Sequence, residues 1–261
     1  MKKIISITIL LLFNTSFSQK KGLVYYGFIE SFNLGNGRGQ DANAYIVFND
    51  KMSYYVTAKD SLENGESKYS EKVIQREDGE GGAIYNGIKV SKDGDQVIYH
   101  PSKKTMWSSL LYGQEVYVKE TTPNFKWIIQ KETKKIGKFI CRKATTSFRG
   151  RTYTAWFAPD VPLPYGPWKF CALPGLILEV YDTNKYLYWY FKSIEFPSQS
   201  KESVKYLRVP KGKKIMNYEE FLVFKENAKQ KSIEKSIILK KQFPDATFKE
   251  PTLNKMFIEC E

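Results

Sequence analysis

The sequence predicts a single domain built mainly from antiparallel β-strands, arranged as a strongly curved sheet or open half-barrel, with a β-sandwich as the alternative. Aromatic residues make up 15% of the 261-residue chain, and such flat, stiff side chains favour pleated sheet. Short apolar runs alternate with turn residues along most of the chain, which is typical of consecutive strands. With 42% hydrophobic and 26% charged residues, the chain can bury a sizeable core, so disorder as the main state is excluded.

The first half of the chain is predicted to be a series of short strands that end at turns. Asn49-Asp50-Lys51 and Lys92-Asp93-Gly94-Asp95 are two such turns. We expect strands at 23–30, 45–48, 52–58, 84–90, 96–100, 105–111, 115–120 and 125–131.

The second half contains the clearest hairpin, in which 138–148 pairs with 151–158 around Arg149-Gly150. Residues 159–174 hold five prolines. Because proline cannot donate to a strand ladder, we expect this segment to be a rigid connection or an edge segment. Two more strands are expected at 176–181 and 186–195.

The strand at 186–195 begins with an aromatic run. Side chains of a strand alternate between its two faces, so one face carries Tyr186, Tyr188 and Tyr190, and the other carries Leu187, Trp189 and Phe191. Both faces are apolar, so we expect the strand to be covered on both sides. The tyrosine face is the candidate face for a ligand or partner, because each ring keeps a polar tip; the alternative is a second core layer.

One amphipathic helix is expected at about 217–241. Asn217 followed by Glu220 forms an approximate capping box, and an apolar stripe contains Tyr218, Leu222, Ile233 and Ile237. Residues 201–241 hold twelve basic and five acidic residues. This segment is predicted either to dock on an anionic surface of lipid or polysaccharide, or to be an ordinary solvated helix face.

The N-terminus is typical of an export signal that is cleaved after Ser18. Lys2 and Lys3 precede the apolar run 4–13, and Ser16 and Ser18 occupy the positions of small residues before the cleavage point. We therefore expect residues 1–18 to be a signal peptide and residues 19–261 to be a soluble periplasmic or secreted protein. No cysteine follows the cleavage point to carry a lipid, and no segment is long and apolar enough to span a bilayer. Export also makes nucleic acid an unexpected partner.

The cysteines and the single histidine limit the chemistry. In an oxidising compartment, Cys141 and Cys171 are the favoured disulfide because they close the shortest loop, with Cys260 left over; three buried thiols are the alternative. His100 is the one histidine, and no spaced Cys/His cluster exists to hold a metal. No residue set identifies a catalytic site, and we expect no cofactor.

Residues 125–191 resemble the GLPGLI family of exported proteins from Bacteroidota-type bacteria. The resemblance rests on Trp127, on the run from Glu132 to Ala144, on Phe148 to Phe157, and on Gly166-Pro167-Trp168-Lys169-Phe170 before Ala172-Leu173-Pro174-Gly175-Leu176-Ile177. The signature positions expected to be structural are Cys141, Gly150, Trp156, Gly166, Pro167, Leu173, Pro174, Gly175, Leu176 and Ile177. The first glycine of the family hexapeptide is Ala172 here, which argues against a positive φ at that position. The resemblance implies export but no established activity.

The sequence thus indicates an exported envelope protein that is a non-enzymatic binding module for an apolar or amphipathic ligand or a partner protein. A rigid rim around a binding groove would present Arg151 and Trp168 as exposed contacts. The alternative is an envelope hydrolase that acts on peptide or glycan through acids that the sequence does not identify.

Overall fold

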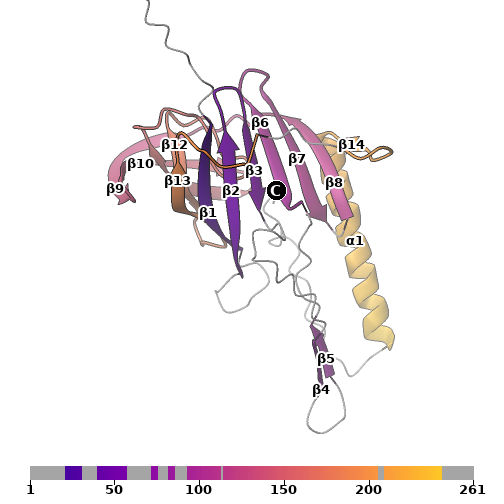
Figure 1. The fold of residues 1–261 in the computed structure, drawn as a ribbon. Helices are drawn as coiled ribbons and strands as arrows, with labels where there is room; N and C mark the ends of the chain where they lie inside the picture. Colours follow the sequence, from indigo (N-terminus) through magenta and orange to yellow (C-terminus); the bar gives the residue numbers. More distant parts are fainter. Residues whose placement is uncertain are drawn as a thin grey trace, which may run out of the picture.

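A strongly curved, open sheet of 12 strands dominates the fold (Figure 1). The structure is a computed structural model that describes residues 21–30, 40–57, 72–75, 82–85, 93–112, 114–204 and 209–242. The strands are β1 (Gly22–Glu30), β2 (Gln40–Phe48), β3 (Ser53–Thr57), β4 (Lys72–Gln75), β5 (Gly82–Tyr85), β6 (Asp95–His100), β7 (Thr105–Tyr112), β8 (Gln114–Thr121), β9 (Ile128–Ile136), β10 (Phe139–Phe148), β11 (Arg151–Ala158), β12 (Leu176–Asp182), β13 (Leu187–Glu195) and β14 (Ile215–Met216). The one helix in this part of the chain is α1 (Tyr218–Gln242).

Two antiparallel meanders meet side by side to form this sheet. The strand order is β14-β8-β7-β6-β3-β2-β1-β13-β12-β11-β10-β9, while β4 and β5 pair with each other. Strand β1 of the first meander and strand β13 of the second pair antiparallel in the middle of the sheet. At one edge β14 pairs parallel with β8, and α1 packs beside them; at the other edge β9 is the terminal strand. The predicted fold class, a curved sheet or half-barrel of mainly antiparallel strands, is confirmed.

The predicted hairpin at Arg149-Gly150 is confirmed, and its turn has a clear conformational cause. Arg149 and Gly150 both have positive φ, 47° and 72°, as the two-residue turns that match the strand twist require.

The expectation of a strand at 125–131 was wrong in its bounds, since β9 runs over 128–136. Most side chains of β9 are exposed, so the strand lacks the buried alternation that would mark it in the sequence.

The proline-rich segment fills the inside of the curved sheet instead of lying at an edge. Its side chains contact strands of both meanders, which places the segment on the concave side. Ring contacts join Tyr165 to Phe48 and Tyr99, Trp168 to Tyr55, and Phe170 to Tyr153 and Trp189. Backbone bonds from Leu176 N to Val161 O (2.9 Å) and from Ile177 N to Tyr165 O (2.9 Å) fix its path. The core therefore occupies the space in which a half-barrel carrier would keep an open lumen.

A second, smaller core covers the opposite face of the first meander. It consists of Leu23, Tyr45, Val47, Met52, Tyr54, Val56 and Ile98. The chain after β13 closes over it, since the Lys21 ammonium donates to Glu202 O (2.7 Å) and the Tyr45 hydroxyl donates to the Glu202 carboxylate (3.2 Å). The sheet is thus covered on both faces at this point.

The helix begins where the sequence predicts, but its buried side differs from the expected stripe. The capping box is confirmed: Glu220 N donates to Asn217 Oδ1 (2.8 Å), and Asn217 N donates to Glu220 Oε2 (2.9 Å). Phe221 is the fully buried residue, whereas Ile237 is 48% exposed. Only the first turns of α1 rest on the body (Figure 1), so among the described residues no strand of the sheet covers the stripe near Ile237. No helix in the described part of the chain could cross a bilayer.

Candidate binding site

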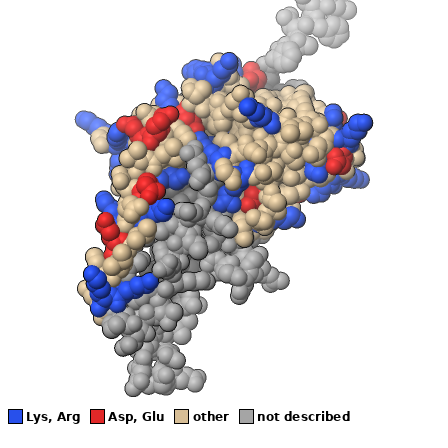
Figure 2. Space-filling model, turned by 180° about the vertical axis from the view of Figure 1, so that it is seen from behind, with Lys and Arg blue, Asp and Glu red and all other residues tan. Residues whose placement is uncertain are grey.

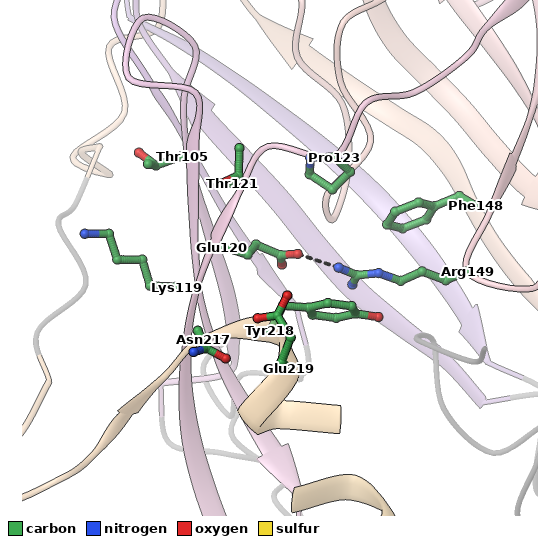
Figure 3. A pocket seen from close by; sticks show the side chains of 10 residues that line it. All are labelled: Thr105, Lys119, Glu120, Thr121, Pro123, Phe148, Arg149, Asn217, Tyr218 and Glu219. Atoms are coloured by element: carbon green, nitrogen blue, oxygen red, sulfur yellow. Dashed lines mark hydrogen bonds and ion pairs between the residues drawn. The ribbon is translucent and has the colours of Figure 1, made fainter. Parts of the chain in front are cut away.

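A pocket of about 470 Å³ opens where three parts of the chain converge (Figure 3). The end of β8, the β10–β11 turn and the first residues of α1 form its walls. Its lining consists of Thr105, Lys119, Glu120, Thr121, Pro123, Phe148, Arg149, Asn217, Tyr218 and Glu219. None of these residues was predicted to line a site.

A buried ion triad forms the base of the pocket. The two carboxylate oxygens of Glu120 accept separate bonds, Oε2 from Arg149 Nη2 and Oε1 from Lys169 Nζ. All three side chains are almost completely withdrawn from solvent. A buried carboxylate is tolerated only when it is paired in this way. The triad therefore ties β8 to the β10–β11 turn and to the proline-rich segment.

Arg149 lies between two aromatic rings. Its guanidinium carbon is 4.7 Å from the centre of the Phe148 ring and 3.9 Å from that of Tyr218. A guanidinium group is planar and stacks well on aromatic faces. Since Tyr218 is the first residue of α1, this stack also fixes where the helix starts on the body.

The pocket walls combine apolar and charged surface. Pro123, Phe148 and the Tyr218 ring are partly exposed apolar groups. Lys119 is exposed at the rim, but its side chain points away from Phe148 and Arg149 (Figure 3), with its ammonium 4.8 Å from the Trp107 ring. The carboxylate of the exposed Glu219 faces the pocket. Such walls suit a small amphipathic molecule, because apolar surface supplies affinity and a few polar groups fix orientation.

The predicted tyrosine face lies elsewhere, on the outer side of β13. Leu187 and Trp189 are fully buried while Tyr188 and Tyr190 are half-buried, so the predicted alternation is confirmed; Tyr186 directly precedes the strand. The rings form a packed layer, in which the centre of the Tyr188 ring lies 5.6 Å from the ring centres of both Tyr181 and Tyr190. Burial and the nearby Glu179 carboxylate raise the pKa of Tyr188.

Arg151 and Trp168 are not the exposed contacts that the sequence suggested. The Arg151 guanidinium donates to Asp182 (3.0 Å), and both side chains are largely buried. Trp168 is buried and packs edge-on against Tyr55. Both predictions were wrong because the proline-rich segment turns inwards instead of forming a rim.

The predicted Cys141–Cys171 disulfide is also wrong. Both residues are free, buried thiols. Burial raises the pKa of each to about 12. The Cys141 sulfur lies near Glu179 and Lys134, whereas that of Cys171 lies near Tyr99, so the two thiols have different neighbours and behave as small apolar groups.

The signature positions shared with the GLPGLI family shape the buried segment. A Cβ at Gly175 would lie 2.4 Å from Ala158 O, and one at Gly166 would lie 2.7 Å from Phe170 O. Ala172 has φ 69°, so the expectation that alanine excludes a positive φ there was wrong. Leu173, Leu176 and Ile177 are buried in the main core, with Cys141 and the partly buried Trp156 packed in or against it. The Pro167 carbonyl accepts from Phe170 N (3.1 Å), while Pro174 is exposed beside the turn.

One cluster of titratable groups has no signal in the sequence. Burial raises the pKa of Asp95 to about 7, and burial together with the charge of Asp95 raises the pKa of Glu30 to about 7. Arg151 lies near Glu30 and counteracts this rise. His100 lies outside the cluster, and burial and Lys103 lower its pKa. Within the described ranges, no three His, Cys, Asp or Glu side chains are grouped to hold a metal ion.

Comparison with known proteins gives one family match and a distant likeness in fold. The model of a family described as a protein of unknown function (Porph_ging) matches residues 149–179, which lie inside the stretch that resembles GLPGLI; the match does not carry the GLPGLI name. No curated protein matches the chain.

Two solved structures of PNGF-II, in the P21 and C2 space groups, are similar to this chain at 14% identity. They cover 76% of this chain with TM-scores of 0.47 and 0.45. This chain spans only 31% and 30% of those two chains.

Proposed function

We propose that this protein is an exported, non-enzymatic binding protein, and that it holds a small amphipathic molecule with an acidic group in the pocket between β8, the β10–β11 turn and α1. The observation that carries the proposal is the combination of an apolar wall at Phe148 and Tyr218 with Lys119 at the rim. The Lys119 side chain points away from this wall (Figure 3), and on binding its flexible four-carbon chain would turn towards the acidic group of the ligand. The filled interior supports the same site, because the proline-rich segment takes the place of an internal ligand.

The pocket is better suited to binding than to hydrolysis. Its buried carboxylate, Glu120, bonds to two cations through its two oxygens, so neither oxygen is left open towards a substrate. Its other acid, Glu219, is exposed at the rim.

The hydrolase alternative is favoured by one observation, the pair Glu30 and Asp95, whose pKa values of about 7 suit proton transfer at neutral pH. If this alternative holds, Glu30→Gln abolishes a peptidase or glycosidase activity of the purified protein. The binding proposal expects no such activity in either form.

A fluorescence titration tests the binding proposal. The probe is 8-anilinonaphthalene-1-sulfonate, which joins an apolar ring system to one anionic group. Lys119→Ala should weaken binding about fivefold through loss of one charge-assisted contact, and Thr121→Trp should block the pocket. Lys138→Ala removes an exposed lysine at the β9–β10 turn and should leave binding unchanged. Equal affinity in all four proteins would refute the assignment of the site.

Three further expectations remain proposals. Residues 1–18 lie outside the described residues, and mass spectrometry of the exported protein should find an N-terminus at Gln19. The tyrosine face of Tyr186, Tyr188 and Tyr190 is a second proposed contact surface, for which Tyr188→Phe should weaken partner binding without loss of stability. Contact with an anionic surface through residues 201–241 predicts salt-sensitive retention on anionic vesicles. Lys and Arg side chains also lie well beyond this segment on the face seen in Figure 2.

A further inference from the structure

The two edges of the sheet differ in how far they are covered. At the β8 edge, β14 adds a parallel strand and the start of α1 packs against it. At the other end, β9 is the last strand, and no described strand pairs with its outer side (Figure 1). An uncovered edge presents outward N–H and C=O groups that can pair with another chain. The β9–β10 register shifts between Ile129 and Thr133, so the regular part of this edge begins at Thr133 and runs to Ile136.

Exposed isoleucines follow this open edge. Ile128 is 67% exposed, Ile129 is 40% exposed, and Ile140 on the neighbouring β10 is 54% exposed. Proteins usually protect an edge strand with charge and avoid apolar side chains on it. Three exposed isoleucines beside an unpaired edge therefore indicate a surface that gains from being covered.

The positive charge of the edge indicates what kind of chain can cover it. Residues 128–143 hold six basic residues and one acidic residue. Two of the cations have acidic partners: Lys134 pairs with Glu179 (2.8 Å) and Lys143 with Glu132 (3.4 Å). For the other four, no ion pair is recorded among the described residues; these are Lys131, Lys135, Lys138 and Arg142.

We propose that β9 is a docking edge for an extended, acidic segment of a partner protein, which adds to the sheet as a further strand. Main-chain bonds to β9 supply affinity in this mode of recognition, and alternate side chains supply specificity. Acidic side chains of the partner pair with Lys131 and Lys135, and its apolar side chains cover Ile128 and Ile129. A second copy of this chain is disfavoured as the occupant, because it brings the same positive charge to the edge.

The register of β9 shows which residues point their backbone groups outwards. The turn at Gly137 and Lys138 has two residues, so the flanking Ile136 and Phe139 form a hydrogen-bonded pair. Thr133 opposite Arg142, and Lys135 opposite Ile140, are then non-hydrogen-bonded positions of the β9–β10 ladder. Their N–H groups point away from β10, towards an incoming strand.

The test uses a synthetic seven-residue peptide that alternates valine with glutamate, titrated against the full protein and followed by NMR shift changes. We expect shifts centred on 128–136. Thr133→Pro removes an outward donor and leaves the β9–β10 bonds intact, so it should weaken binding at least about fivefold, as loss of a main-chain bond does. Thr133→Ala is its matched control. The double variant Lys131→Glu, Lys135→Glu should abolish binding.

Three results would overturn the proposal. The first is equal binding of a peptide with lysine in place of glutamate. The second is that Thr133→Pro binds the peptide as tightly as the wild-type protein does. If that variant does not fold, the corresponding result is that the wild-type protein binds a peptide N-methylated at alternate residues as tightly as the unmethylated peptide. The third is a concentration-dependent dimer of the protein alone that Thr133→Pro dissolves, which would assign the edge to a second copy.

Discussion

Replacement of Glu120 by glutamine tests whether the buried ion triad holds the open side of the sheet together. The Glu120 carboxylate bonds to both Arg149 and Lys169. Glu120→Gln keeps the size of the side chain but removes its charge, which leaves two buried cations without their shared anion. Breaking a buried pair in this way costs about 3–5 kcal/mol. For a chain of this length, such a loss lowers the melting temperature by roughly 10 °C.

The exposed pair of Glu132 and Lys143 supplies the matched control. Its ends lie 3.4 Å apart with side chains 58% and 28% exposed, so Glu132→Gln should change stability by less than about 1 kcal/mol. Thermal unfolding followed by circular dichroism measures both variants. Lys169→Met should cost less than Glu120→Gln, because it leaves Glu120 paired with Arg149. Equal effects of Glu120→Gln and Glu132→Gln would refute the reasoning.

Three other substitutions probe the fold. Because the folded pKa of Glu30 is raised from 4.5 to about 7, this group alone should lower the stability of the wild-type protein by up to about 3 kcal/mol as pH rises through 4.5–7. Asp95, whose pKa is also raised to about 7, should add to the fall, so urea unfolding at both ends of this range should show a flatter but still falling profile for Glu30→Gln. Ala172→Gly should stabilise the protein by about 0.5–1 kcal/mol, since glycine takes a positive φ without strain, and a rise in melting temperature checks this. Trp189 is fully buried and donates to the Tyr55 hydroxyl (2.8 Å), so Trp189→Ala should cost about 3–5 kcal/mol in a thermal melt.

Local patterns in the sequence predicted the features that depend on neighbouring residues. The alternation of Leu187 and Trp189 with Tyr188 follows from the two-residue period of a strand. The capping box of Asn217 and the turn at Arg149-Gly150 also involve only a few consecutive residues. Such features are determined by residues within one short segment, so they can be recognised without knowledge of the fold.

Exposure and the pocket could not be predicted in the same way. Trp168 is buried because the proline-rich segment folds back between strands that are distant in sequence. The strand β9 is largely exposed, so no hydrophobic period marks its residues 132–136. The pocket unites Lys119, Phe148 and Tyr218, which come from three separate segments, and each of them has an ordinary local environment in the sequence.

A crystal structure of the protein soaked with 8-anilinonaphthalene-1-sulfonate tests the central claim most directly, because it shows where an amphipathic anion binds. We expect the rings of the probe to lie against Phe148 and Tyr218, its sulfonate to lie near Lys119, and residues 159–175 to keep their place inside the sheet. Probe density inside the curved sheet, with this segment displaced, would contradict the proposed site. It would show that the inside of the curved sheet is the binding site.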